Sequence, residues 1–315
     1  MPGGDRDHGL ASAAVAGDGE RLAVARADGT LLVVRISDGA VLFRDHPADH
    51  VLKFAAWSSD GARLAIASTT GTGLIEYAAA GAFARLPSPE LGALRRVVAL
   101  HSGARIAAPY AIGLHIISAQ GTVLPYAPTP VAGEAQSFRD LAVSAGQRYG
   151  VAVDAAGGFH RIDDGANVAI RPLASVPGAE VADISRDGAR IAVGSEGRIA
   201  LLAGDGRPLA AAATGGDRIH DVAFSPDGRW LALGELSGTA RILDATTLQL
   251  RAVLAGHARR VSAVAFDPAG RWLATASWDG SARLWDLPTL TTPAATLLTQ
   301  AEARWGLELE RALGR

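Results

Sequence analysis

Three residues near the end of the chain have side chains that could form a hydrolytic site. Ser277 and Asp279 lie two residues apart, and His257 precedes Ser277 by twenty residues. A hydroxyl, an imidazole and a carboxylate make an activated nucleophile when they meet in space. The chain lacks Gly-x-Ser-x-Gly, Gly-x-x-x-x-Gly-Lys and His-Glu-x-x-His motifs. No nearby group supplies an oxyanion hole, so we expect these residues to be structural.

The remaining histidines do not form a ligand-spaced cluster. Two short segments, residues 5–8 and 46–50, place carboxylates beside imidazoles, and a polar surface loop explains both better than a metal site. We therefore expect no metal and no cofactor. The seven histidines outside the candidate triad are His8, His46, His50, His101, His115, His160 and His220.

Composition excludes several classes of function. The formal net charge is −2 and the pI is near 6.4, so no global positive field attracts nucleic acid. Cysteine is absent, which excludes disulfides and cysteine-ligated zinc. No secretion signal is visible at the start of the sequence, and prolines interrupt the one long uncharged segment, residues 106–133. We expect a cytoplasmic protein that binds neither nucleic acid nor membranes.

A turn of the form (Ser/Asp)-x-(Asp/Ala)-Gly-(Arg/Gln)-x-(Leu/Ile)-Ala, or a degraded copy of it, occurs seven times. Successive turn glycines are 42, 42, 43, 42, 40 and 42 residues apart. We number the repeats, or units, one to seven by these glycines. A period near forty residues built from short apolar strands is typical of a β-propeller. The seven glycines are Gly19, Gly61, Gly103, Gly146, Gly188, Gly228 and Gly270.

The last unit predicts the strand order of the others. Residues 261–266, 272–277 and 282–286 alternate with turns that contain Pro268 and Gly270, and Asp279 and Gly280. An outer strand is expected at 294–298 after a short loop. The matching second strands are predicted at 21–25, 63–68, 105–108, 149–153, 190–195 and 230–234. Pro109 adjoins the third of these, and proline is tolerated in sheets mainly at edges or bulges.

The last unit resembles the repeats of the WD-repeat family. The resemblance rests on Gly256-His257, Ser277, Asp279 and Trp285-Asp286, and it is strong across residues 215–287. It implies a buried relay in which Asp279 orients His257, which bonds the Ser277 hydroxyl, which meets the Trp285 indole. The relay is complete only here. Leucines replace the tryptophan at positions 243 and 202, and Gly215 replaces the histidine in the sixth unit.

The expected fold is therefore all-β: a seven-bladed β-propeller of four-stranded antiparallel blades over residues 1–298, with a short C-terminal helix. Each unit owns its four strands, so residues 2–8 are not needed to complete the last blade. Residues 299–315 form the predicted amphipathic helix, which carries Trp305. Two roles for this helix remain open: it caps the ring, or it docks on a partner.

Arginines and aromatic residues at loop junctions are the candidate binding residues. Dibasic pairs precede two inner strands, and Trp278 lies between the relay residues at the same face. Arginine anchors carboxylates and phosphates well, but a solvated rim charge or a packing role for Trp278 is the alternative. The candidate partner-binding residues are Arg95, Arg96, Arg259, Arg260, Trp278 and Trp305.

The motifs describe a scaffold and no chemistry. The resemblance implies a noncatalytic protein-protein interaction scaffold, with one copy of the chain in a hetero-complex with another protein. The single lysine, Lys53, among many arginines and alanines is typical of GC-rich bacterial genomes, which favours a subunit of a bacterial signalling or defence complex. The alternative is a propeller hydrolase or lactonase, or a small-ligand module, that uses the central channel. That alternative requires acidic residues or histidines on several inner strands, where Ala, Val and Leu predominate.

Overall fold

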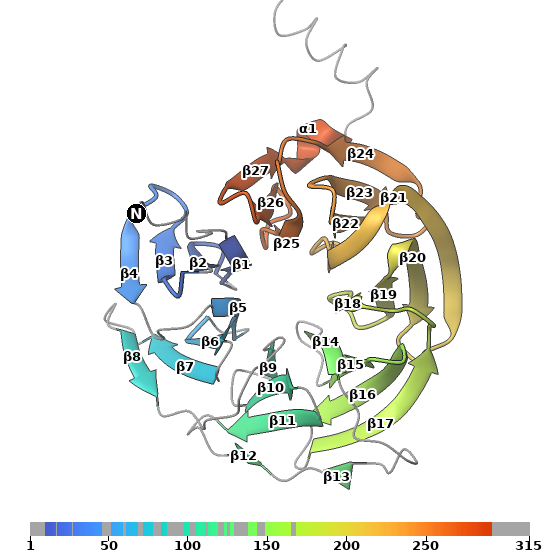
Figure 1. The fold of residues 1–315 in the computed structure, drawn as a ribbon, viewed down its shortest axis with the longest axis horizontal. Helices are drawn as coiled ribbons and strands as arrows, with labels where there is room; N and C mark the ends of the chain where they lie inside the picture. The colour runs from blue at the N-terminus through green and yellow to red at the C-terminus, as the bar shows by residue number, and fades with distance from the viewer. Residues whose placement is uncertain are drawn as a thin grey trace, which may run out of the picture.

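The computed structural model is an all-β protein of mostly antiparallel strands (Figure 1). It describes residues 10–16, 18–26, 28–45, 52–58, 61–68, 72–77, 83–86, 98–100, 105–110, 113–118, 123–124, 127–128, 138–143, 149–164 and 168–291. Three sheets have four strands each: β1 (Leu10–Val15), β2 (Arg21–Arg26), β3 (Leu31–Arg35) and β4 (Val41–Asp45); β5 (Leu52–Trp57), β6 (Arg63–Ser68), β7 (Thr72–Tyr77) and β8 (Phe83–Leu86); β9 (Val98–Leu100), β10 (Arg105–Tyr110), β11 (Gly113–Ser118) and β12 (Val123–Leu124).

The second half of the chain forms three further sheets. A five-stranded sheet holds β13 (Ala127–Pro128), β14 (Phe138–Val143), β15 (Tyr149–Asp154), β16 (Gly158–Asp164) and β17 (Val168–Ser175). A seven-stranded sheet holds β18 (Val181–Ile184), β19 (Arg190–Gly194), β20 (Glu196–Ala203), β21 (Pro208–Phe224), β22 (Trp230–Glu235), β23 (Ala240–Asp244) and β24 (Leu250–Leu254). The last contains β25 (Val261–Phe266), β26 (Trp272–Ser277) and β27 (Ala282–Asp286), and α1 (Leu287–Thr291) follows it.

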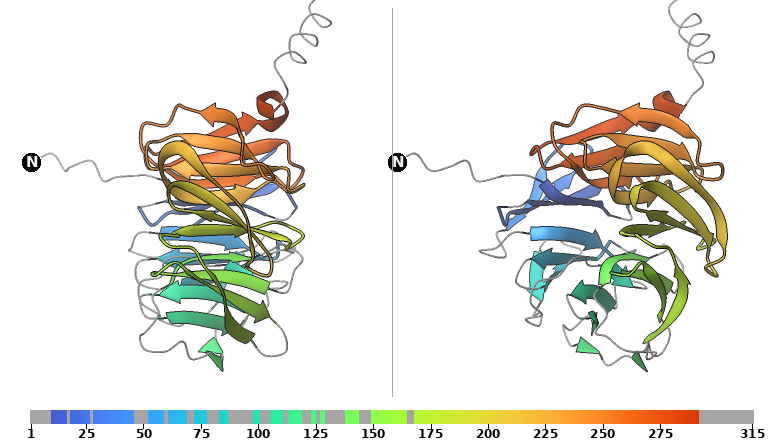
Figure 2. Two further views of the ribbon diagram at one scale, coloured as in Figure 1. Left: turned by 90° about the vertical axis from the view of Figure 1, so that its right-hand side faces the viewer. Right: turned by 45° about the vertical axis from the view of Figure 1, so that its right-hand side comes forward.

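The sheets follow one another around a common centre. Figure 1 shows the first strand of each unit nearest that centre and the later strands progressively farther out. In Figure 2 the strands run across the thickness of this arrangement. The seven-stranded sheet contains units five and six because β21 first pairs with β20 as an outer strand and then with β22 as an inner strand.

The predicted strands agree closely with the structure. β6, β25, β26 and β27 have the predicted bounds, and the other second strands differ by one or two residues at their ends. Pro109 lies in β10 and faces Leu114 of β11, whereas the described ladder to β9 ends at Ala107. The missing N–H of Pro109 is thus beyond the end of that ladder. One pairing is not antiparallel, because the two-residue β13 joins β17 in parallel.

The repeated turns have the backbone geometry that their sequence predicts. The turn glycines of units one, two, five, six and seven have φ between 67° and 72°, which L-residues with a Cβ rarely adopt. Each glycine N–H donates to the carbonyl three residues before it; the five glycines are Gly19, Gly61, Gly188, Gly228 and Gly270. The equivalent glycines of units three and four, Gly103 and Gly146, lie outside the described residues.

The hydrophobic core is divided among the junctions between neighbouring units. One cluster joins unit five to unit six through Ile199, Leu201, Val222 and Leu231, all buried. Other clusters join units one and two, three and four, four and five, and six and seven. A unit therefore buries its faces only when its neighbours are in place.

Hydrogen bonds from inner-strand side chains to neighbouring backbones also join the units. The Asp140 carboxylate accepts a hydrogen bond from Ala182 N–H at 2.7 Å, and Asp221 accepts one from Val264 N–H at 2.9 Å. Asp183 accepts from Phe224 N–H at 2.7 Å, and the Ser12 hydroxyl accepts from Ala55 N–H at 3.3 Å. In all four, donor and acceptor are 41 to 43 residues apart.

A second set of bonds joins the units at the other end of the strands. The first residue of β2, Arg21, donates to the carbonyl of Gly61 at 3.0 Å. Arg190, the first residue of β19, donates to the carbonyl of Gly228 at 2.7 Å. The Tyr149 hydroxyl, at the start of β15, donates to the carbonyl of Gly188. Each bond reaches the turn glycine of the next unit, so the turn signal also serves as an acceptor site.

The first and last units pack on each other through small side chains. Ala13 and Val24 contact the buried pair Ala263 and Ala276. Residues 2–8, the predicted outer strand 294–298 and the predicted helix 299–315 all lie outside the described residues. The short loop expected after residue 286 instead begins with the helical turn α1, whose Leu287 is buried in the last cluster.

Replacing Asp221 by alanine is expected to lower the free energy of unfolding by about 1.5–3 kcal/mol, because the buried Val264 N–H loses a charged acceptor. Urea denaturation followed by circular dichroism measures this change. The control is Asp205→Ala, whose side chain is 69% exposed. Equal midpoints for the two variants would show that the inter-unit bond does not stabilise the fold.

Candidate functional site

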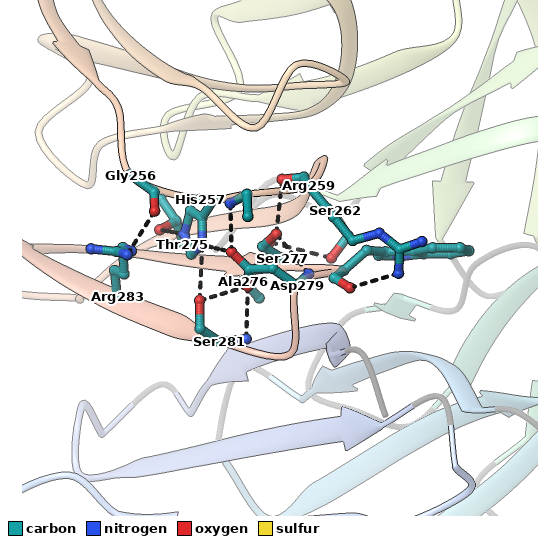
Figure 3. Close-up of polar contacts among 12 residues, drawn as sticks. Gly256, His257, Arg259, Ser262, Thr275, Ala276, Ser277, Asp279, Ser281 and Arg283 are labelled. Atoms are coloured by element: carbon teal, nitrogen blue, oxygen red, sulfur yellow. Dashed lines mark hydrogen bonds and ion pairs between the residues drawn. The ribbon is translucent and has the colours of Figure 1, made fainter. Parts of the chain in front are cut away.

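The polar residues of the last unit form a buried network between β26, β27 and the loop before β25. His257 Nε2 lies 2.7 Å from the Thr275 hydroxyl oxygen, and the Trp285 indole N–H donates to the same oxygen at 3.0 Å. His257 Nδ1 lies 3.2 Å from an Asp279 carboxylate oxygen and 3.1 Å from the Ser281 hydroxyl. Figure 3 shows His257 between the strand hydroxyl and the turn carboxylate. The predicted relay of His257, Asp279 and Trp285 thus meets at Thr275.

The prediction that Ser277 supplies the relay hydroxyl is wrong. Ser277 and Thr275 share one face of β26, but Ser277 is the last residue of the strand, beyond the reach of the imidazole. Its hydroxyl instead donates to the Arg259 carbonyl at 2.9 Å and accepts from Asp279 N–H at 3.1 Å. Ser277 therefore holds the turn that carries Trp278 and Asp279 (Figure 3).

The Asp279 carboxylate is held in its charged form. Burial alone would raise its pKa, but the Ser281 hydroxyl, the Ala258 and Ser281 N–H groups and His257 all bond to it. These hydrogen bonds hold the pKa of Asp279 well below its ordinary value. A carboxylate that accepts this many bonds fixes the loop before β25 against the turn after β26.

These residues do not reach solvent. Thr275 is 1% exposed, Ser277 is 0% exposed and the side chain of His257 is 1% exposed. A nucleophile or general base must contact its substrate, and buried hydroxyls already bonded to protein groups cannot do so. The network therefore fits a structural role.

The sixth unit replaces the relay with apolar residues and an ion pair. The strand registers place Leu243 opposite Leu231, where the last unit has Trp285 opposite Leu273, and Leu233 takes the place of Thr275. Glu235, at the Ser277 position, is 0% exposed and accepts from Arg241 Nε at 2.8 Å. Burial raises the pKa of Glu235, and Arg241 opposes that shift.

Sequence reasoning missed Glu235 because it ends an apolar strand without a neighbouring motif. The signal was available in the loop before the sixth unit, at Gly215-Gly216. A Cβ on Gly216 would lie 1.9 Å from a Glu235 carboxylate oxygen, so only glycine allows the loop to cross the carboxylate. The Gly215-Gly216 pair therefore does two things. It removes the relay histidine, and it leaves room for the buried Glu235 carboxylate.

The fourth unit contains another buried imidazole and carboxylate that the sequence did not bring together. His160 Nε2 of β16 lies 2.8 Å from Asp154, the last residue of β15. The same carboxylate accepts hydrogen bonds from Ala156 and Gly158 N–H, both at 2.8 Å. Burial opposes the charged form of Asp154, but these bonds lower its pKa. Both residues are at least nine-tenths buried, which again fits a structural pair.

The inner strands are more acidic than expected. Most of their residues are apolar, but Asp183 and Asp221 line a cavity of about 310 Å³ together with residues of β1, β5 and β25. The 41- to 43-residue spacing between these aspartates and their partners was the missed signal. Among the described residues, no group of three His, Asp or Glu side chains could hold a metal ion.

The exposed candidate residues Arg259 and Trp278 and the half-buried Arg260 lie together at one end of β26. The Arg260 guanidinium stacks over the Trp278 ring, with Cζ 3.2 Å from the ring centroid. Arg259 Nη1 donates to the Trp278 carbonyl at 3.4 Å, and the Trp278 side chain remains 39% exposed. The other candidates, Arg95, Arg96 and Trp305, lie outside the described residues.

The repeated sheets and the buried relay define a β-repeat protein whose polar network is part of its core. The model of the WD domain, G-beta repeat, matches residues 209–244 and 248–286, which are units six and seven. These two matches support the WD-repeat resemblance that the sequence predicts for residues 215–287. A comparison with curated proteins gave no match. Within the described part of the chain, none of the helices has the length and apolar character needed to span a membrane.

Thr275→Val is expected to lower the free energy of unfolding by about 1–3 kcal/mol, since it keeps the shape of the side chain but removes the partner of two buried ring nitrogens. Thermal and urea unfolding measure the change. Thr246→Val, at an exposed threonine, is the matched control. A Thr275→Val protein as stable as this control would contradict the relay.

Asp279→Asn is expected to reduce the dependence of stability on acid pH. Because the pKa of Asp279 is lower in the folded than in the unfolded state, its carboxylate stabilises the fold fully above about pH 4. That stabilisation is lost as the pH falls toward the folded pKa. The difference in unfolding free energy between pH 7 and pH 3 should therefore be smaller in Asp279→Asn than in the wild type or in the exposed control Asp205→Asn; an unchanged difference would refute the assignment.

Proposed function

We propose that the chain is a noncatalytic protein-protein interaction scaffold built as a seven-bladed WD-repeat propeller. The single observation that carries this function is the surface group of exposed Arg259 and Trp278 with half-buried Arg260, which a buried polar network holds in place. WD40 repeats generally mediate protein-protein interaction. In the last unit, the polar side chains that could take part in catalysis are buried and bond to other protein groups.

Three features support the propeller architecture. The turn glycines define seven units of nearly equal length, and the sheets follow one another around a centre (Figure 1). The described strands give units one to six four antiparallel strands each. The contacts of Ala13 and Val24 with Ala263 and Ala276 join the ends of the series. We propose that residues 1–298 form this domain, that the ring closes without a swapped strand, and that residues 299–315 are a helical tail.

The proposed partner is another protein, bound by one copy of this chain in a hetero-complex. The interaction surface is the end of the last unit where β26 leads into the Ser277–Gly280 turn. A half-exposed tryptophan beside two arginines has the composition of an interface hot spot. We place this complex in the bacterial cytoplasm, in signalling or defence, on the strength of the family resemblance and the arginine-rich, lysine-poor composition.

The alternative is a ligand or a reaction in the central cavity, which Asp183 and Asp221 favour by lining it. Both carboxylates, however, accept hydrogen bonds from backbone N–H groups of the next unit. A carboxylate held in this way has less capacity to act as a base or to bind a ligand. The same residues therefore support the scaffold, since they join its units.

The test is affinity purification of the tagged chain from its native host beside two variants. Arg260→Ala/Trp278→Ala is expected to lose a stoichiometric protein partner while it keeps the wild-type melting temperature. The matched control is Arg271→Ala/Trp272→Ala, an exposed arginine and tryptophan at the opposite end of β26. Loss of the partner in the control alone, or a wild-type chain that elutes without a protein, would refute the proposed surface.

A further inference from the structure

Charged residues of alternating sign, Arg139, Glu180 and Arg218, lie near the starts of the inner strands of units four to six. The Glu180 carboxylate lies between two arginines from the neighbouring units, with Arg139 Nη1 3.6 Å from one oxygen. Arg218 binds both Glu180 oxygens, one of them through Nε at 2.6 Å. The hydrogen bonds to Glu180 raise the pKa of the Arg218 guanidinium. The Glu180 carboxylate thus balances the charge of Arg218.

Arg260 holds the position of Arg218 one unit later. The Leu236 N–H donates to the Arg218 carbonyl at 2.9 Å, and the Trp278 N–H donates to the Arg260 carbonyl at 3.1 Å. The two arginines thus occupy equivalent places before β21's inner half and before β25. Glu180 holds the same place before the inner strand of unit five. Arg260 therefore lacks the anion that Glu180 supplies to Arg218.

No residue of the described chain supplies that anion. Arg260 forms no ion pair with any described carboxylate, and its buried Nε donates no hydrogen bond to a described residue. Burial and the nearby Arg259 lower the pKa of Arg260. A guanidinium stacked on an aromatic ring keeps its N–H edge free for a planar oxyanion.

His220 lies within electrostatic range of both arginines. It lies in the inner half of β21, partly buried, and forms no hydrogen bond with a described residue. Burial lowers its pKa, and Arg260 and Arg218 lower it further, while Glu180 and Asp217 oppose the shift. Burial and the two arginines together therefore favour the neutral imidazole in the free protein.

We propose that Arg260, Arg218 and His220 form a carboxylate-binding site for an acidic segment of the protein partner, with Trp278 as its apolar wall. An Asp or Glu side chain of the partner pairs with Arg260 as Glu180 pairs with Arg218. This inference rests on the proposed function and specifies the chemistry of the partner.

The charge balance favours a peptide carboxylate over a nucleic acid. Glu180 already pairs with Arg218, and Arg260 is the arginine of this group that pairs with no described carboxylate. Nucleic acids bind along tracks of several cations, and the net charge of this chain is −2. A partner segment with one carboxylate and a neighbouring apolar side chain would complement Arg260 and the Trp278 ring.

The first experiment measures fluorescence anisotropy of a labelled peptide of Glu-Leu-Glu-Gly repeats and of its counterpart with Gln at every Glu. We expect the Glu peptide to bind about five- to tenfold more tightly than the Gln peptide, and Arg260→Gln to remove that difference. Arg271→Gln, whose side chain is 72% exposed at the other end of β26, should retain it. Equal binding of the two peptides, or an unchanged preference in Arg260→Gln, would overturn the proposal.

The second measurement is the pH dependence of the same binding between pH 7.5 and 5.5. A bound carboxylate favours the imidazolium form of His220, so binding takes up a proton and the affinity should rise as the pH falls below about 6.5. His220→Gln should flatten this profile without abolishing the preference for Glu. A wild-type profile that is flat over this range would remove His220 from the site.

Two further outcomes separate this inference from the proposed function. Tighter binding of a labelled oligothymidylate than of the Glu peptide, lost in Arg260→Gln, would replace the carboxylate by a nucleic acid and overturn the proposal. Failure of the Glu peptide while Arg260→Ala/Trp278→Ala still loses its protein partner would refute the carboxylate chemistry and leave the scaffold intact.

Discussion

Hydrogen bonds from side chains of one unit to the backbone of the next are the interaction on which this structure depends. A single unit has two apolar faces and cannot bury either alone. Asp140, Asp183 and Asp221 each bind a backbone N–H one repeat away, and Arg21 and Arg190 bind the turn glycine carbonyls at the other end of the strands. These bonds are directional, so they fix how neighbouring sheets sit on one another, which apolar contact alone does not.

The same requirement that buried polar groups find partners explains why the units differ. In the last unit Thr275 satisfies an imidazole and an indole at once. In the sixth unit Gly215 replaces the histidine, leucines replace the tryptophan and the threonine, and Glu235 and Arg241 introduce a different pair. A network that lost only one member would leave its neighbours buried without partners, at a cost of about 1–3 kcal/mol each. The family motif is therefore retained whole in one unit and replaced in the other.

The exposed surface of the last unit depends on this buried chemistry. Ser277 and Asp279 hold the turn from which Trp278 projects, and Arg260 stacks on that ring. The sequence pointed to Arg259, Arg260 and Trp278 because they flank the motif. It did not predict that Arg260 holds the same place in its unit as Glu180 and Arg218 hold in theirs, since those residues lie 80 and 42 positions away.

By itself, the sequence determined the elements, because these depend on local rules. Alternating apolar residues give strands, and glycine at a left-handed position ends them, so β6 and the three described strands of the last unit have the predicted bounds. Only the tertiary structure decided which polar side chains meet. Thr275 and not Ser277 completes the relay, Asp221 reaches Val264, and His160 meets Asp154. Such pairs depend on the register and bulges of strands from separate parts of the chain. A local sequence pattern carries no information about the distance between two such side chains.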